Sequence, residues 1–139
     1  MRTPTPGVPV LGGESLTFSD RRQIENALAM ARRVSDLNFE AYIGPAGADA
    51  RAYALAVHSQ LADPENSVLV LCDPEARALE IVTGQETRQY LSDADCRLAV
   101  ATMTSSFLAG LFVNGLARGI SQLGEIAHHP ATLHAAGLL

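Results

Sequence analysis

The sequence predicts an α/β fold: a short mixed β-sheet, formed by a βαβ unit and a β-hairpin and packed with about four helices. The first observation is a continuous apolar run over residues 68–72 between polar turn residues, which is typical of a strand covered on both faces. The second is an alternating run over residues 38–44, separated from the first by a helical pattern. The third is size, because 139 residues with a hydrophobic fraction of 47% suit one core and one domain.

The first predicted helix covers about residues 20–35. Ser19 or Asp20 is expected to cap it, because each side chain has an oxygen that can accept an N–H bond from the first turn. Apolar residues recur behind this cap at helical spacing: Ile24, Ala27, Leu28, Ala31 and Val34. They predict a helix with one face in the core and a charged face in solvent.

The βαβ unit is predicted to follow. Residues 38–44 alternate as a half-buried strand does, and the apolar side chains on one face are Phe39, Ala41 and Ile43. Asp49 is expected to begin a helix that ends at residues 63–64, because the residue before a proline avoids the helical region. This helix connects the strand at 38–44 to the run at 68–72, so we expect these strands to pair in parallel.

The chain is then predicted to form a hairpin and two more helices. Residues 78–83 follow residues 68–72 after a turn at 73–76 that leaves no room for a crossover, so these strands are expected to pair antiparallel. The helices are predicted over about residues 93–109 and 111–128. Together these elements complete the predicted sheet and its helical cover.

One segment has the length of a membrane span. Residues 98–117 contain no charged side chain over twenty positions, which is enough to cross a bilayer. Their serines and threonines, and a glycine at position 110, favour a pair of buried helices instead. We therefore do not expect a membrane span.

The ends of the chain and its composition set further limits. Residues 1–13 are expected to form a flexible N-terminal arm, residues 14–128 the single folded domain and residues 129–139 a C-terminal tail. The net charge of −5, with no lysine and no basic stripe, gives no reason to expect binding to nucleic acid. Cys72 and Cys96 have no zinc-site spacing, so we expect reduced thiols in a cytoplasmic protein.

An ordered series of short motifs runs through the chain. It comprises FEAYIG at 39–44, AD at 48–49, PENSVL at 64–69, EIVTG at 80–84, and SSF at 105–107 with Gly110 and Gly115-Leu116. Over about residues 14–125, this series resembles an uncharacterised actinobacterial domain family that is distantly related to TPM domains. The resemblance implies a TPM-like α/β sandwich. TPM relatives are linked to acid phosphatase activity, to divalent cation binding and to the assembly or quality control of membrane complexes, so the resemblance implies roles of these kinds.

Two groups of side chains are candidate site residues. The first lies at the carboxyl ends of the predicted parallel strands, where ligands of open α/β sheets tend to bind. It comprises Asp49, Asp73 and Glu75. Their carboxylates could supply the oxygen ligands that Ca²⁺ or Mg²⁺ prefers. Alternatively, Asp49 only caps a helix and Asp73 only begins a turn.

The second group lies at the alternative edge and comprises Gly84, Glu86, Arg88 and Asp93. Gly84 and the loop after it are expected to shape a small site. Alternatively, Asp93 is explained by its place at the start of a helix, where capping and the helix dipole favour a carboxylate.

The function expected from these observations is non-catalytic. The sequence contains no GxSxG, HExxH, P-loop or dinucleotide-binding motif. We therefore expect a protein-interaction or accessory module that acts through a protein partner of unknown identity. The alternative is a divalent-cation-dependent acid phosphatase-like hydrolase. The sequence specifies neither the partner nor the oligomeric state.

Overall fold

The computed structural model describes residues 16–128, so the predicted arm at 1–13 and the predicted tail at 129–139 lie outside the described residues. The described part is a mixed α/β domain, which confirms the predicted fold class. Its helices and strands are α1 (Phe18–Ser35), β1 (Asn38–Ile43), α2 (Ala50–Ser59), β2 (Ser67–Asp73), β3 (Ala78–Thr83), α3 (Asp93–Leu108) and α4 (Phe112–Ile126).

The sheet has the strand order β1-β2-β3, which places β2 in the centre. β1 pairs with β2 in parallel, with Phe39 beside Val68. β2 and β3 form the predicted antiparallel hairpin, with Val70 beside Ile81. Every residue of β2 is buried, which confirms the central strand predicted from the apolar run. β1 and β3 are therefore the two edges of the sheet.

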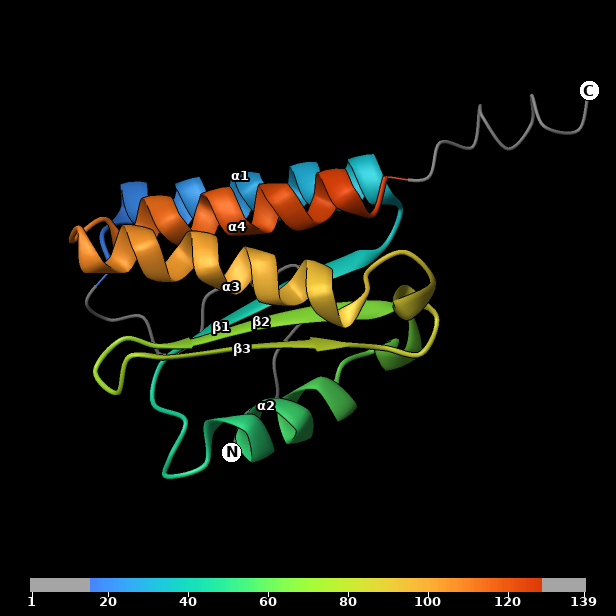
Figure 1. Ribbon diagram of the computed structural model, residues 1–139, viewed down its shortest axis with the longest axis horizontal. Helices are drawn as coiled ribbons and strands as arrows, with labels where there is room; N and C mark the ends of the chain where they lie inside the picture. The colour runs from blue at the N-terminus through green and yellow to red at the C-terminus, as the bar shows by residue number, and fades with distance from the viewer. Residues whose placement is uncertain (1–15, 129–139) are drawn as a thin grey trace, which may run out of the picture.

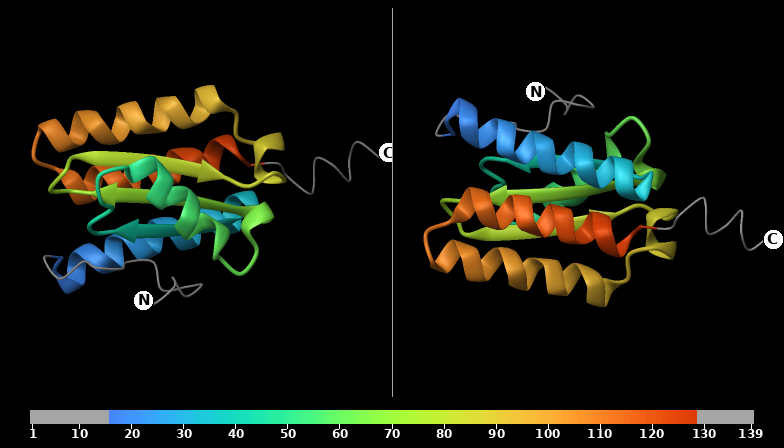
Figure 2. Two further views of the ribbon diagram at one scale, coloured as in Figure 1. Left: turned by 90° about the horizontal axis from the view of Figure 1, so that it is seen from below. Right: turned by 90° about the horizontal axis from the view of Figure 1, so that it is seen from above.

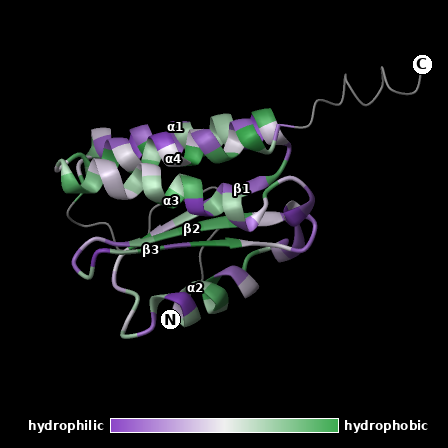
Figure 3. Cartoon of the chain, viewed as in Figure 1, coloured by the Kyte–Doolittle hydropathy of each residue, from purple (hydrophilic) through white to green (hydrophobic). Residues whose placement is uncertain are grey.

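Helices cover both faces of the sheet (Figure 1). α1, α4 and α3 lie side by side over one face, and α2 covers the other (Figure 2). The larger core cluster contains Phe39 and Val70 from the sheet, and the smaller one joins Ala54 of α2 to Leu69 and Leu71. Figure 3 shows the hydrophobic β2 between these layers. The helix α3 runs along the β3 edge of the sheet (Figure 2).

The cap of α1 is Thr17, so the prediction of Ser19 or Asp20 as the cap is wrong. The Thr17 hydroxyl accepts a bond from the Asp20 N–H at 3.0 Å, and the Asp20 carboxylate accepts one from the Thr17 N–H at 3.1 Å. This reciprocal pair satisfies two backbone donors at once, so the helix begins at Phe18, two residues before Asp20.

The helix α2 begins as predicted but ends earlier. Asp49 is its N-cap, with its carboxylate accepting the Ala52 N–H at 3.0 Å. The helix ends at Ser59 and not at residues 63–64. The reason is a tightened last turn, in which the Gln60 N–H donates to the carbonyl of the third residue before it at 3.1 Å.

The uncharged segment at 98–117 forms parts of two helices, as predicted. Gly110 lies between them with φ 80°, a left-handed conformation that glycine adopts without strain. α3 and α4 pack against each other on the sheet (Figure 1). In the part of the chain that the structure describes, no helix combines the length and apolarity needed to cross a membrane.

Candidate functional site

Two of the three carboxylates predicted at the carboxyl edge of the sheet, those of Asp49 and Asp73, accept hydrogen bonds from backbone N–H groups. Asp49 caps α2, and Asp73 is buried at the end of β2. One Asp73 oxygen accepts the Ala46 N–H at 3.0 Å, and the other accepts the Ala76 N–H at 3.2 Å. Glu75 is exposed on the hairpin turn. Asp73 thus connects the loop after β1 to the hairpin turn.

These carboxylates do not gather into a metal-binding group. Among residues 16–128, no three His, Cys, Asp or Glu side chains lie close enough together to hold a metal ion. The Ca²⁺ or Mg²⁺ site at Asp49, Asp73 and Glu75 therefore stays a prediction. The bonds made by Asp49 and Asp73 agree with the alternative interpretation, in which one caps a helix and the other holds a turn.

The variant Asp73→Ala distinguishes these interpretations. We expect it to lower the free energy of unfolding by about 2–4 kcal/mol, because the buried Ala46 N–H and the partly buried Ala76 N–H lose a charged acceptor. Urea denaturation measures this loss, and Glu75→Ala, on the exposed turn, is the control that should change little. A melting temperature that rises saturably with Ca²⁺ in the wild type, and not in Asp73→Ala, would instead support the cation site.

The residues predicted at the alternative edge make separate contacts, and a site formed by them stays a prediction. Gly84 packs against backbone: an added Cβ would lie 2.0 Å from the Pro64 carbonyl oxygen. The Glu86 carboxylate accepts a bond from its neighbour along the chain, Gln89, at 2.9 Å. Arg88 donates to the Thr83 carbonyl at 3.2 Å. Of the predicted residues, Asp93 lines a cavity, and this cavity is a groove the sequence analysis missed.

The groove lies between the edge strand β3 and the helix α3, and we call it the strand-edge groove. Its volume is about 560 Å³. Apolar side chains line it, among them Leu79 and Ile81 from β3 and Val100 from α3. Charged side chains also line it: Arg51, Glu80, Asp93 and Arg97. The groove therefore combines an apolar surface with charges of both signs.

The backbone of β3 faces this groove. The Gly84 N–H donates to the Ser67 carbonyl at 3.0 Å, so Gly84 and Ser67 are a hydrogen-bonded pair. This pair shows which of the opposite residues in β2 and β3 are hydrogen-bonded to each other. Since bonded pairs alternate in an antiparallel ladder, the N–H and C=O groups of Leu79, Ile81 and Thr83 point away from β2. They form the row of donors and acceptors that an edge strand presents.

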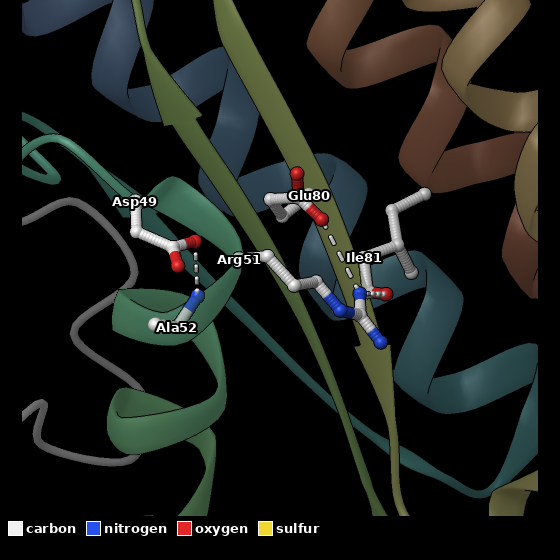
Figure 4. A network of polar contacts seen from close by, with 5 residues as sticks. All are labelled: Asp49, Arg51, Ala52, Glu80 and Ile81. Atoms are coloured by element: carbon white, nitrogen blue, oxygen red, sulfur yellow. Dashed lines mark hydrogen bonds and ion pairs between the residues drawn. The ribbon is translucent and has the colours of Figure 1, made fainter.

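Arginine side chains contact this row from outside the sheet. Arg51 extends from α2 past the edge of β3, where its guanidinium donates to the Ile81 carbonyl at 2.9 Å (Figure 4). It also lies 3.3 Å from the Glu80 carboxylate. Arg88 contacts the Thr83 carbonyl in the same way. Charged side chains that cover part of an edge strand discourage uncontrolled pairing with other chains.

The groove contains no activated cysteine. Cys96 lines it, but burial, together with Asp93 and Asp95, raises the pKa of this thiol above its ordinary value. Burial, with a contribution from Asp73, also raises the pKa of Cys72 to about 12. Because the thiolate is the nucleophilic form, both thiols are poor nucleophiles near neutral pH.

Most of this site had no signal in the sequence. Arg51 belongs to an amphipathic helix, where a lone arginine is usually solvated. Its contact with the Ile81 carbonyl depends on how α2 packs against the sheet. One usable signal was overlooked. In the predicted three-stranded sheet the strand at 68–72 pairs with both others, so β3 had to be an edge and its exposed row could have been predicted.

Solved structures of several bacterial proteins have the same fold. The N-terminal domain of a P. gingivalis protein matches with a TM-score of 0.73 at 17% identity, covering 94% of this chain and 99% of that chain. The N-terminal domain of cg2496 from Corynebacterium glutamicum matches at 0.70 and 15%, covering 90% and 83%. BA42 from Bizionia argentinensis matches at 0.72 and 20%, covering 83% of each. At these identities the similarity shows the fold alone.

Sequence relatives are found in Mycobacterium tuberculosis. The chain is 30% identical over 106 residues to Uncharacterized protein MT2543 of strain CDC 1551 and, with the same values, to Uncharacterized protein Rv2468c of strain H37Rv. The alignment covers 76% of this chain and 64% of each relative, so the chain spans under two thirds of their length. Residues 11–124 match the family described as "Domain of unknown function (DUF5130)". Because this match covers most of the chain, the protein belongs to the DUF5130 family.

Proposed function

We propose that this domain is a non-catalytic protein-interaction module that binds an extended segment of a partner protein along β3. The single observation that carries the proposal is the strand-edge groove, in which the outward row of β3 faces the helix α3. PDZ and PTB domains likewise bind peptides by adding a strand to an exposed sheet edge. The likeness to them is one of binding mode and not of family.

Backbone hydrogen bonds would supply much of the affinity. The outward N–H groups of Leu79, Ile81 and Thr83 are donors for the carbonyls of an added strand. Their carbonyls are acceptors, two of which accept bonds from Arg51 and Arg88. These arginines are exposed, so they can move aside when a peptide N–H takes their place. In the free protein their bonds keep part of the edge occupied.

The groove would also supply contacts for side chains. Residues of an added strand point alternately to the two faces of the sheet. On one face they would meet Val100 and Ala101 of α3, and on the other they would meet Arg51 and Glu80. β3 has six residues, so the bound segment would be of similar length. A groove of about 560 Å³ is within the size range of ligand-binding clefts.

Two further expectations remain proposals beside this one. The distant relation to TPM domains is supported by the ordered motifs between residues 39 and 116. It agrees with an interaction role, since TPM relatives are linked to the assembly of membrane complexes. The cytoplasmic location is supported by the cysteines Cys72 and Cys96, which are both free thiols. Neither expectation is needed for strand addition.

The experiment selects ligands for the full chain from a displayed library of randomised short peptides. A selected peptide is then synthesised in two N-methylated forms. One form is methylated at the odd-numbered residues and the other at the even-numbered residues. Because only alternate N–H groups of an added strand face β3, one form is expected to bind about 10-fold or more weakly and the other close to normally. A library that yields no ligand, or two forms that bind equally, would overturn the proposal.

A further inference from the structure

A smaller apolar cavity continues the strand-edge groove toward the β2–β3 turn, and we call it the hairpin pocket. Its volume is about 180 Å³. Its apolar lining comes from Leu79, Phe107, Leu108 and Phe112. Leu79 lines both cavities, so the pocket lies where the groove reaches the hairpin. A strand bound along β3 would pass beside it.

The side chains of the hairpin pocket are suited to holding an apolar group. Phe107 and Phe112 pack edge to face, with ring centroids 5.4 Å apart. Leu108, next to them, is 76% exposed although it is a large hydrophobic residue. Aromatic and aliphatic side chains around a concave site are typical of the pockets that hold the anchor residues of binding partners.

One charged side chain, Arg77, lines the hairpin pocket. It lies on the hairpin turn with φ 56° and is exposed. Within residues 16–128, the ion pairs join Arg32 to Glu40 and Arg51 to Glu80, so the Arg77 guanidinium has no carboxylate partner there. An apolar pocket with an unneutralised cation at its rim is complementary to an apolar side chain beside an anion.

Building on the proposed strand addition, we infer that the partner segment carries a large aliphatic or aromatic residue two positions from an aspartate or glutamate, so that both side chains point to the same face. The apolar residue would lie opposite Leu79 and enter the hairpin pocket, because residues opposite each other on neighbouring strands share a face. The carboxylate two positions along the segment, toward the hairpin turn, would then pair with Arg77. The ligand class is therefore an extended peptide with an apolar–acidic residue pair at one end of the strand.

The test repeats the peptide selection with three forms of the full chain: wild type, Arg77→Glu and Arg33→Glu. Arg33 is an exposed arginine on α1, so its reversal is a control with the same change in net charge. Wild type and Arg33→Glu are expected to select the apolar–acidic pair. Arg77→Glu is expected to keep the apolar residue and to select lysine or arginine in place of the acidic one.

A second measurement tests the anchor residue. In a synthetic peptide from the wild-type selection, replacing the apolar anchor by alanine is expected to weaken binding about 10-fold or more. Replacing the acidic residue by glutamine is expected to weaken it about fivefold or less, because exposed ion pairs are weak. If the peptide with alanine at the anchor position binds as tightly as the original peptide, the hairpin pocket does not hold the anchor residue.

The failure of this inference can be told apart from failure of the proposed function. Peptides that bind with the alternate N-methylation pattern but lack the apolar–acidic pair would overturn the inference and leave strand addition standing. An acidic preference that survives Arg77→Glu would do the same. Selections that yield no ligand with any form of the chain would overturn both.

Discussion

Replacing Gly84 by alanine is expected to lower the free energy of unfolding by about 3 kcal/mol. An added Cβ would lie 2.0 Å from the Pro64 carbonyl oxygen and 2.4 Å from that of Glu65. Neither side can move easily, since the Gly84 N–H is bonded to Ser67 at 3.0 Å and the Glu86 N–H to Glu65 at 2.8 Å. Both backbones are thus fixed to the same end of the sheet. Urea denaturation measures the loss.

The matched control is Gly47→Ala. Gly47 has φ 77°, and no atom lies within 4 Å of the position its Cβ would occupy. The cost there is that of a left-handed alanine, about 1–2 kcal/mol. If both alanine variants lose the same stability, close packing at Gly84 is not the reason for the glycine. Gly84 then returns as a candidate for shaping a site.

Replacing Phe39 by alanine is expected to cost about 3–5 kcal/mol, the loss typical of a large buried aromatic residue. Phe39 is 0% exposed and lies on the face of β1 that packs against the helices. Its removal leaves a cavity between the sheet and the three helices, which the surrounding backbone can only partly fill. The midpoint of urea denaturation is the measurement.

Two further variants serve as a control for the loss of a phenylalanine and as a milder substitution at Phe39. Phe18→Ala is the control, because Phe18 is 74% exposed and its loss should change stability by about 0.5 kcal/mol or less. Phe39→Leu keeps most of the volume and remains measurable if the alanine variant does not fold. A loss for Phe39→Leu as small as that for Phe18→Ala would contradict the position of β1 in the core.

The sheet was predictable because its signals are local. The run at 68–72 is apolar at every position, and so short a run between turns is typical of a strand covered on both faces. The short turn after it permits only an antiparallel partner. The cap of α1 was predicted wrongly because Ser19, Asp20 and Thr17 are all capping residues. The choice among them depends on the reciprocal bond between Thr17 and Asp20.

The candidate site was less predictable because it depends on contacts between distant segments. Asp49 and Asp73 were chosen for their carboxylates, yet their oxygens are bonded to nearby backbone N–H groups. Arg51 and Ile81 are thirty positions apart, and only the packing of α2 on the sheet brings them together. Sequence periodicity can place both residues on their elements, but it cannot give the distance between those elements.

Amide hydrogen exchange, followed by NMR with a peptide selected from the library, tests strand addition most directly. Glu80 and Val82 are internal controls, since their N–H groups already face β2 and should exchange at unchanged rates. We expect the peptide to slow exchange, within β3, only at the outward N–H groups of Leu79, Ile81 and Thr83. A bound peptide that leaves those three amides unchanged would contradict it.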